Sequence, residues 1–320
     1  MNTIINRHEI LPNSINTLPM LHEGEVIADR YEVLPHVARS DRKLLGFTEN
    51  SSVCPAVDIQ SETEVAVKLL RKNTVPALGR HQIEQLVGNN VSHEGIIPTL
   101  ATGIYSGQDG RINPFIVTKQ GNDGYHNLEI DHSSEGAQEF FGRMAKIALA
   151  LTYLHEEKGI AHGDVKSSNI ILDNGHTFLN DFSTTEAIRE INSTNPLINS
   201  ELTEEITIIN KENEDILVGT PSHLSPQRLE GNHLTAEDDT FALGVTIFEF
   251  LTKRHPYNST SSDIYVQANL LKKSSPLPAE ELPNFVSDEV SGALYASIEK
   301  LPQNRPSSRE MARVLLSAAS

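Results

Sequence analysis

The hydrophobic residues of this chain follow one spacing up to about residue 133 and another beyond it. In the first part, short runs of β-type residues are bounded by polar residues, glycine or proline, which is typical of strands. The runs are RYEVL at 30–34, VAVKLL at 65–70, IIPTL at 96–100 and PFIVT at 114–118. Between Ala77 and Val91, apolar residues recur at roughly helical spacing and predict one amphipathic helix among the strands.

Beyond Ser133 the pattern is helical. Apolar residues recur at helical spacing in 135–155, in 236–252 and in the last thirty residues. The junction QGNDGYHNLEID contains Gly121 and Gly124, where we expect a hinge. The sequence therefore predicts an α+β chain in which a strand-rich half is joined to a helix-rich half.

Two segments lack a clear period. Residues 1–23 are polar and rich in turn formers, and we expect a flexible N-terminal arm before a domain that covers 24–320. Residues 184–218 are acidic and rich in Ser, Thr and Asn, so we expect a long mobile loop there. The sequence does not indicate the role of either segment.

Composition narrows the class of partner. Lys and Arg total 26 against 43 Asp and Glu, a formal net charge of -17, so nucleic acid is not an expected partner. The single cysteine, Cys54, excludes an intramolecular disulfide and fits a reducing compartment. The sequence has neither a conventional secretory signal nor an apolar run of the about 18 residues that span a bilayer. We therefore expect a cytoplasmic protein, with export by another route left open and the oligomeric state undetermined.

A group of residues suited to phosphoryl transfer follows the helical segment 135–155. It lies in HEEKGIAHGDVKSSN and FLNDFS and comprises Asp164, Lys166, Asn169 and Asp181. Phosphoryl transfer needs a carboxylate to orient and deprotonate a hydroxyl, a cation near the phosphoryl group and two oxygen ligands for Mg²⁺. These four residues supply each of those groups.

The same residues resemble the signature set of eukaryotic-type protein kinases. VAVK, ending at Lys68, is similar to the third-strand lysine motif, and Glu84 follows sixteen residues on, where the family has its lysine-pairing glutamate. The lead-in GEVIADRYEVL is similar to that of bacterial members. Further segments that resemble the family are HEGII at 93–97, GTPSHLSPQ at 219–227, DDTFALGVTIFEFLTKRHPY at 238–257 and QNRPS at 303–307.

The resemblance implies a bilobal protein-kinase-like fold. We expect a small antiparallel N-lobe sheet with one helix over about 24–120, and a larger, mainly helical C-lobe over about 121–320 with an activation loop at about 181–227. It also implies ATP and Mg²⁺ as cofactors, with Mn²⁺ as an alternative metal, and a protein substrate.

The resemblance assigns a role to each residue. Asp164 would accept the proton of the substrate hydroxyl, and Lys166 would neutralise charge on the transferring phosphoryl group. Lys68, paired with Glu84, would bind the α- and β-phosphates. The implied Mg²⁺ ligands are Asn169 and Asp181, and the other implied nucleotide-binding residues are Gly46, Val53, Ala66 and Thr118.

The glycine-rich loop over the phosphates is the poorest match to the family. Counting back from Lys68 gives GFTENSSV at 46–53, which keeps one glycine of three. The separation from Tyr31 to Lys68 exceeds the usual one, so an insertion is expected in the first hairpin, and a second register places the turn near ARSDRK. Because glycine lets the backbone approach a phosphate, both registers predict weaker or altered ATP contact.

Three further positions depart from the family. Gly163 stands where many kinases have an arginine that pairs with a phosphorylated activation loop, so we expect an active state that does not require this phosphorylation. Ser183 replaces the glycine after Phe182 and should restrict a backbone flip. Gln227 replaces a glutamate that pairs with Arg305, so a charge-assisted hydrogen bond is expected instead of an ion pair.

The sequence thus predicts a Ser/Thr protein kinase that transfers the γ-phosphoryl group of ATP to protein hydroxyls. Lys166, two residues after Asp164, favours this class, because the related choline and aminoglycoside kinases commonly carry His there. Two alternatives stay open. One is a pseudokinase that acts as a binding or scaffold module, which the missing glycines and Ser183 favour, and the other is a small-molecule phosphotransferase.

Overall fold

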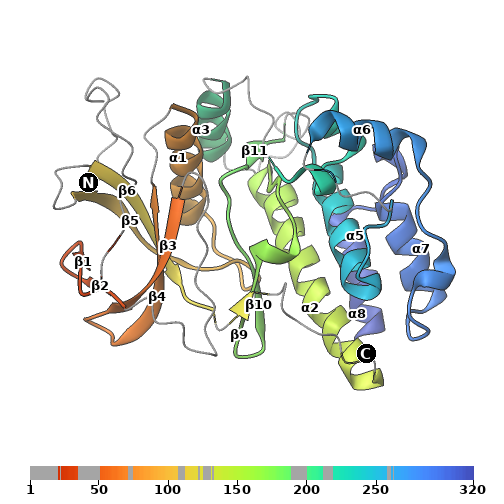
Figure 1. The fold of residues 1–320 in the computed structure, drawn as a ribbon, viewed down its shortest axis with the longest axis horizontal. Helices are drawn as coiled ribbons and strands as arrows, with labels where there is room; N and C mark the ends of the chain where they lie inside the picture. Colours follow the sequence, from red (N-terminus) through yellow and green to blue (C-terminus); the bar gives the residue numbers. More distant parts are fainter. Residues whose placement is uncertain are drawn as a thin grey trace. The chain divides into compact units, whose positions relative to one another are not determined.

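The computed structural model describes residues 21, 23–34, 51–70, 75–106, 112–121, 123–124, 131, 133–188, 200–211, 219–257, 261 and 263–320. These residues form two compact units. The first unit holds the described residues up to His81 together with Thr99–Gln120, and the second holds those of Gln82–Pro98 and Gly121–Ser320. The longer strands belong to the first unit and most of the helices to the second (Figure 1).

The first unit is built on an antiparallel sheet of six strands in the order β1-β2-β3-β4-β6-β5. The strands are β1 (Val26–Ile27), β2 (Tyr31–Val33), β3 (Ser51–Asp58), β4 (Thr63–Leu70), β5 (Thr99–Ser106) and β6 (Ile112–Lys119). One face of the sheet packs into an apolar core that includes Tyr31, Cys54, Val65, Val67, Leu69, Phe115 and Val117. Because side chains alternate along a strand, the residues between these core positions point to the opposite face.

The boundaries of this unit differ from the prediction in three places, the largest being that Gln82–Pro98, with the later part of α1, belongs to the second unit. Leu21, which was assigned to the flexible arm, is buried in the sheet core, so the packed part of the chain includes it. IIPTL at 96–100 was predicted as a strand, but β5 begins only at Thr99. Ile96 instead forms an isolated parallel bridge with Leu179 of the second unit, to which it belongs.

The second unit is mainly helical. Its helices are the later part of α1 (Val75–Asn90), then α2 (Ser134–Tyr153), α3 (Ser200–Lys211), α4 (Pro226–Leu229), α5 (Ala236–Thr252), α6 (Ile264–Lys273), α7 (Asp288–Ser297) and α8 (Ser308–Ala318). Short strands are β7 (Asp123–Gly124), β8 (Ile160–Ala161), β9 (Ile170–Asp173), β10 (His176–Leu179) and β11 (Glu186–Ala187). Helices α2, α5 and α8 contact one another around a core of aromatic and aliphatic side chains (Figure 1).

Local signals fix where these helices begin. Ser133 caps α2 by accepting a hydrogen bond from the Gly136 N–H at 3.1 Å. Capping boxes formed by Thr235 with Asp238 and by Ser307 with Glu310 start α5 and α8. Such side chains satisfy backbone N–H groups that have no partner inside the helix. The helices predicted at 77–91, 135–155 and 236–252 are confirmed as α1, α2 and α5.

The segment expected to be a long mobile loop contains a regular helix. Helix α3 buries Leu202 and Ile206 in the core of the second unit, and Ile209 packs against the same core. Asn210 Nδ2 donates a hydrogen bond to Thr185 O at 3.1 Å, which ties the helix to the chain after Phe182. An apolar residue every three to four positions is enough for one amphipathic helix even in an acidic segment.

The close packing of α5 on α7 gives a testable consequence for stability. A Cβ added at Gly244 would lie 2.0 Å from Ser297 Oγ and 3.0 Å from Ile298 Cγ2, so Gly244→Ala should destabilise the protein by about 1–3 kcal/mol. Gly292 on α7 has no heavy atom within 4 Å of such a Cβ, so Gly292→Ala should be neutral or stabilising. Urea unfolding of both variants measures the difference, and equal midpoints would contradict this packing.

Buried His81 on α1 predicts a loss of stability in acid. Burial, assisted by the charge of Lys68, lowers the pKa of His81 to about 3. Below the ordinary histidine pKa of about 6.5 the unfolded chain therefore binds more protons than the folded chain, and stability falls by about 2 kcal/mol on going to pH 5. We expect His81→Leu to lose this part of the pH dependence of urea unfolding. Exposed His176, changed to Gln, is the control, and an unchanged pH slope in His81→Leu would exclude the effect.

Candidate active site

Four residues of the predicted nucleotide site share one face of the sheet in the first unit. Val53 on β3 faces Lys68 on β4, and Ala66 on β4 faces Thr118 on β6. Ala66 and Lys68 are two residues apart on one strand, so the four side chains point to the same side. That side is opposite the face that carries Val65, Val67 and Leu69 into the core. The sheet thus brings together a cation and three small or medium side chains.

Two further residues of the predicted nucleotide site, Gly46 and Glu84, are not among the described residues of this sheet face. Gly46 lies outside the described residues, as does the alternative turn near ARSDRK. The described pairing of β2 with β3 ends at Val33 and Ala56, and the insertion expected in this hairpin falls outside the described residues. Glu84 is buried on α1, in the part of that helix that belongs to the second unit, whereas Lys68 belongs to the first.

In the second unit, Asp164 is held by three polar side chains. Its Oδ2 lies 2.7 Å from Lys166 Nζ and accepts a hydrogen bond of 3.0 Å from Asn169 Nδ2. Its Oδ1 accepts hydrogen bonds from Thr220 N at 3.1 Å and Thr220 Oγ1 at 2.7 Å. Lys166 Nζ also donates to Thr220 Oγ1 at 2.6 Å. The carboxylate is therefore fixed in orientation, with a cation beside it.

Asn169 and Asp181, the predicted metal ligands, lie on neighbouring loops joined by a backbone hydrogen bond. Asn180 N donates to Asn169 O at 2.9 Å, and Asp181 adopts a left-handed φ of 65°. Since Asn169 Nδ2 donates to Asp164, its Oδ1 is the amide atom that can coordinate a cation. Within the described ranges no three His, Cys, Asp or Glu side chains form a metal cluster. Mg²⁺ commonly takes only one or two protein oxygens beside phosphates, so this pair fits it.

A buried carboxylate on α5 holds the backbone that precedes Asp164. Asp239 Oδ2 accepts hydrogen bonds from His162 N at 2.7 Å and lies 2.9 Å from His155 Nε2, and its Oδ1 accepts from Gly163 N at 2.8 Å. Burial alone would raise the pKa of Asp239, but these donors outweigh burial and hold its pKa below the ordinary value. Asp239 therefore lies charged at 1% exposure and is paired on both oxygens.

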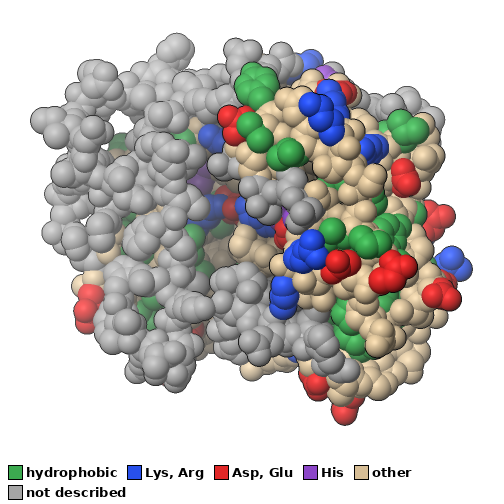
Figure 2. Space-filling view, turned by 45° about the vertical axis from the view of Figure 1, so that its right-hand side comes forward, with side chains coloured by type: hydrophobic (Ala, Val, Ile, Leu, Met, Phe, Trp, Pro, Cys, Tyr) green, Lys and Arg blue, Asp and Glu red, His purple; other side chains and the backbone are tan. Residues whose placement is uncertain are grey.

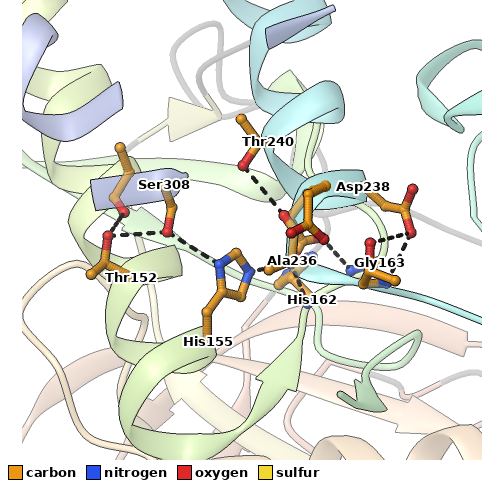
Figure 3. A network of polar contacts seen from close by, with 12 residues as sticks. Thr152, His155, His162, Gly163, Ala236, Asp238, Thr240 and Ser308 are labelled. Atoms are coloured by element: carbon orange, nitrogen blue, oxygen red, sulfur yellow. Dashed lines mark hydrogen bonds and ion pairs between the residues drawn. The ribbon is translucent and has the colours of Figure 1, made fainter. Parts of the chain in front are cut away.

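The same network continues to the C-terminal helix. Ser308 Oγ, at the start of α8, lies 3.1 Å from both His155 Nδ1 and Thr152 Oγ1 (Figure 3). His155 lies in a π-helical turn, Leu154–Lys158, that ends α2. The end of α2 and the start of α8 thus position His155 against the carboxylate of Asp239. This carboxylate holds the segment 162–169, which carries Asp164 and is called the catalytic loop.

The contacts of His162 are structural. It is fully buried, its Nε2 lies 3.0 Å from Asn180 O, and its Nδ1 accepts a hydrogen bond of 3.2 Å from Asp164 N. Its ring packs edge to face on Phe182 with 5.0 Å between centroids. His162 therefore joins the loop of Asp164 to the loop of Asp181.

Gly163 has no room for a side chain. Its φ is +85°, and a Cβ would lie 2.7 Å from Thr184 O and 2.9 Å from Leu234 Cδ2. L-residues rarely adopt that φ, so the steric and the conformational limits agree. The glycine found where many kinases have arginine is therefore required by this packing.

The contact expected between Gln227 and Arg305 is confirmed. Arg305 Nη2 donates to Gln227 Oε1 at 2.7 Å, and the guanidinium also donates to the backbone carbonyl oxygens of Glu237 and Glu299. A neutral amide oxygen thus serves as the acceptor where a carboxylate would form an ion pair.

Two residues at this site were missed from the sequence. Thr220 lies within GTPSHLSPQ and Asp239 within DDTFALGV, both of which were recognised only as segments. Asp239 is far in sequence from His162 and Gly163, whose amides donate hydrogen bonds to it, so residue spacing does not predict the contact. Only the resemblance of the two segments to the family indicated that they belong to the site.

Comparison with known proteins agrees with this geometry. The protein kinase domain family matches residues 39–316. Similar proteins include the serine/threonine-protein kinase PknB of Mycobacterium leprae, 26% identical over 87% of this chain and 41% of that protein. A probable serine/threonine-protein kinase of Corynebacterium efficiens is 27% identical over 88% of this chain and 40% of its own length. A probable PknB of Lactococcus lactis is 25% identical over 76% of this chain and 35% of its own length.

This chain belongs to the protein kinase family, as the sequence motifs indicated. The predicted α+β fold class, with an antiparallel sheet in one part and helices in the other, is confirmed. The chain spans about two fifths of the length of the first relatives described. No helix in the described ranges is both long enough and apolar enough to cross a membrane.

The Asp239 network predicts the effect of one conservative substitution. Asp239→Asn would replace a carboxylate oxygen with an N–H donor facing backbone N–H groups, and should cost about 1–3 kcal/mol or more of stability. Faster amide exchange at His162 and Gly163, measured by mass spectrometry, is expected together with a lower urea midpoint. Exposed Glu289, changed to Gln, is the control for a lost surface charge. Unchanged protection of both amides in Asp239→Asn would show that the carboxylate does not hold the loop.

Proposed function

We propose that this chain is a Ser/Thr protein kinase that transfers the γ-phosphoryl group of ATP to Ser or Thr hydroxyls of a protein substrate. The observation that carries this proposal is the Asp164 carboxylate, which Lys166, Asn169 and Thr220 fix in one orientation. A general base must be held within reach of the proton that it accepts, and its neighbours decide whether that orientation is kept.

The four site residues of the second unit each have a proposed role in this reaction. Asp164 would accept the proton of the attacking hydroxyl, while the Lys166 ammonium, 2.7 Å from that carboxylate, would balance negative charge on the transferring group. When bound, Mg²⁺ would neutralise and orient the phosphates of ATP. Asn169 Oδ1 and the Asp181 carboxylate are the oxygens proposed to hold it.

The sheet face of the first unit is the proposed nucleotide surface. Val53, Ala66 and Thr118 would contact the adenine, and Lys68, on the same face, would bind the α- and β-phosphates with Glu84 as its partner. Gly46 is the remaining residue proposed to cover the phosphates. We propose that the sheet-face residues of the first unit and the residues around Asp164 in the second unit bind the same nucleotide.

The two alternative functions have different support. A pseudokinase would need no intact base, so the complete set of contacts around Asp164 favours an enzyme. Small-molecule transfer is disfavoured by Lys166 and by its bond to Thr220, a residue of the segment that resembles protein kinases. Acidic and basic side chains are interspersed on the described part of the face in Figure 2, so this part of the surface does not distinguish a basic from an acidic protein substrate.

A phosphotransfer assay tests the proposal. Purified protein with labelled ATP, Mg²⁺ and a generic basic protein should transfer label, and Asp164→Ala should reduce the rate by about 100-fold or more. Lys68→Met should reduce both the rate and ATP affinity, because it removes the proposed phosphate contact. Removal of Mg²⁺ with EDTA should stop transfer, and circular dichroism would check that each variant is folded.

The outcomes separate the three functions. Equal label transfer by the wild type, Asp164→Ala and Lys68→Met would rule out this active site. ATP binding by the wild type, measured by calorimetry, without transfer would support the pseudokinase. ATP turnover that a metabolite stimulates and a protein does not would support a small-molecule substrate.

A further inference from the structure

The two ends of the activation loop are joined by an ion pair that the sequence did not suggest. Glu186 lies on β11, soon after Asp181, and Arg228 lies on α4, next to Gln227 at the end of the loop. Arg228 Nη2 donates to Glu186 Oε1 at 2.8 Å. Residues far apart in sequence are thus connected beside the catalytic loop, because β11 pairs with β8, which leads into His162.

Arg228 is buried, Glu186 is half-buried, and the hydrogen bonds of both side chains extend to the backbone. The Arg228 side chain is 8% exposed and that of Glu186 is 23% exposed. Arg228 Nη1 donates to Asn232 O at 2.6 Å, and Glu186 Oε2 accepts from Leu234 N at 3.1 Å. Exposed ion pairs contribute little, but loss of the Glu186 carboxylate would leave the buried Arg228 guanidinium without its anion. The pair therefore constrains the chain from residue 228 to residue 234.

This constraint acts directly on the residue before Asp164. Leu234, whose N–H donates to Glu186, places its Cδ2 against the position that a Cβ of Gly163 would occupy. Thr184 O closes the other side of Gly163, and Thr184 Oγ1 donates to His162 O at 2.8 Å. Ala161, Ile188 and Leu234 are buried together behind these contacts. The Glu186–Arg228 pair thus holds Leu234 in its packed position beside Gly163.

No cation can be supplied from position 163, since its φ and its neighbours exclude a side chain. In this chain the cation comes from α4, and the anion that it meets is a carboxylate already present in the sequence. We propose that Glu186 and Arg228 are positioning residues for phosphoryl transfer, and that this internal pair holds together the two described ends of the activation loop without a phosphate on the loop. The inference rests on the kinase activity proposed above.

Charge-neutralising variants test the pair. Glu186→Gln and Arg228→Gln should each lower kcat for a protein substrate by about tenfold or more, with a smaller change in the KM for ATP, because the catalytic loop is displaced. The double variant should fall no further than the worse single variant, since the two residues act as a unit. Exposed Lys272 and Glu230 form a pair at 2.9 Å near the end of α4, and Lys272→Gln is the matched control, expected to keep wild-type kcat.

A second measurement does not depend on catalysis. Amide exchange at Gly163 and Leu234 should be faster in Glu186→Gln and Arg228→Gln than in the wild type and in Lys272→Gln. Wild-type protein produced with a phosphatase, and shown by mass spectrometry to carry no phosphate, should keep its initial rate and its amide protection. This readout also separates release of the loop ends from a general loss of folding, which would increase exchange throughout the helices.

Two results would overturn the proposed role of the Glu186–Arg228 pair. Wild-type kcat and unchanged protection in both variants would overturn it, as would a loss of about tenfold or more in rate when the wild type is freed of phosphate. If the wild type transfers no phosphoryl group, the proposed function fails, and amide exchange alone decides whether the pair holds the loop ends together. Faster exchange confined to Gly163, Leu234 and their neighbours would then support the structural part of the inference.

Discussion

The described catalytic loop depends on one buried charge, the carboxylate of Asp239. An ionised side chain at 1% exposure is tolerable only when donors replace the water that it has lost. Here the donors are the backbone N–H groups of His162 and Gly163 and the ring of His155. Satisfying Asp239 therefore fixes the backbone immediately before Asp164. The need of the Asp239 carboxylate for hydrogen-bond donors thus helps to fix the position of Asp164, the proposed catalytic base.

Other loops are ordered by contact with this fixed backbone. The Asn180 carbonyl oxygen lies next to the His162 ring, Thr184 contacts Gly163, and Thr220 bonds Asp164. At Gly163 and at Thr220 these contacts require a small residue or a short polar side chain, because the loops approach closely there. Gly163 shows the limit most clearly, since even one carbon atom would collide with a backbone oxygen. Tight approach of three loops thus restricts which residues the site accepts.

Features with clear local sequence patterns were predicted, whereas features that depend on contacts between distant residues were missed. Helices α2 and α5 follow from helical spacing, and the Asp164 to Asp181 group follows from residue type and order. Strand β3 was missed because Pro55 and two serines weaken its pattern, although pairing with β4 makes it regular. Helix α3 was missed because acidic residues obscured the stripe that contains Leu202 and Ile206. The Glu186–Arg228 pair joins residues 42 positions apart, so no local pattern could reveal it.

Two of the departures from the family concern contacts with a phosphate. They are the glycines that the sequence predicts to be missing from the phosphate loop and Gly163, at places where a kinase would contact a phosphate of ATP or of its own activation loop. The residues around Asp164, by contrast, keep their cation, amide and hydroxyl contacts in full. The change at Gln227 does not concern a phosphate, and its amide oxygen still accepts a hydrogen bond from Arg305. A pseudokinase would have no need to preserve the orientation of its base while its phosphate contacts changed. The distribution of these changes therefore favours a kinase with altered phosphate contacts over a protein that has lost catalysis.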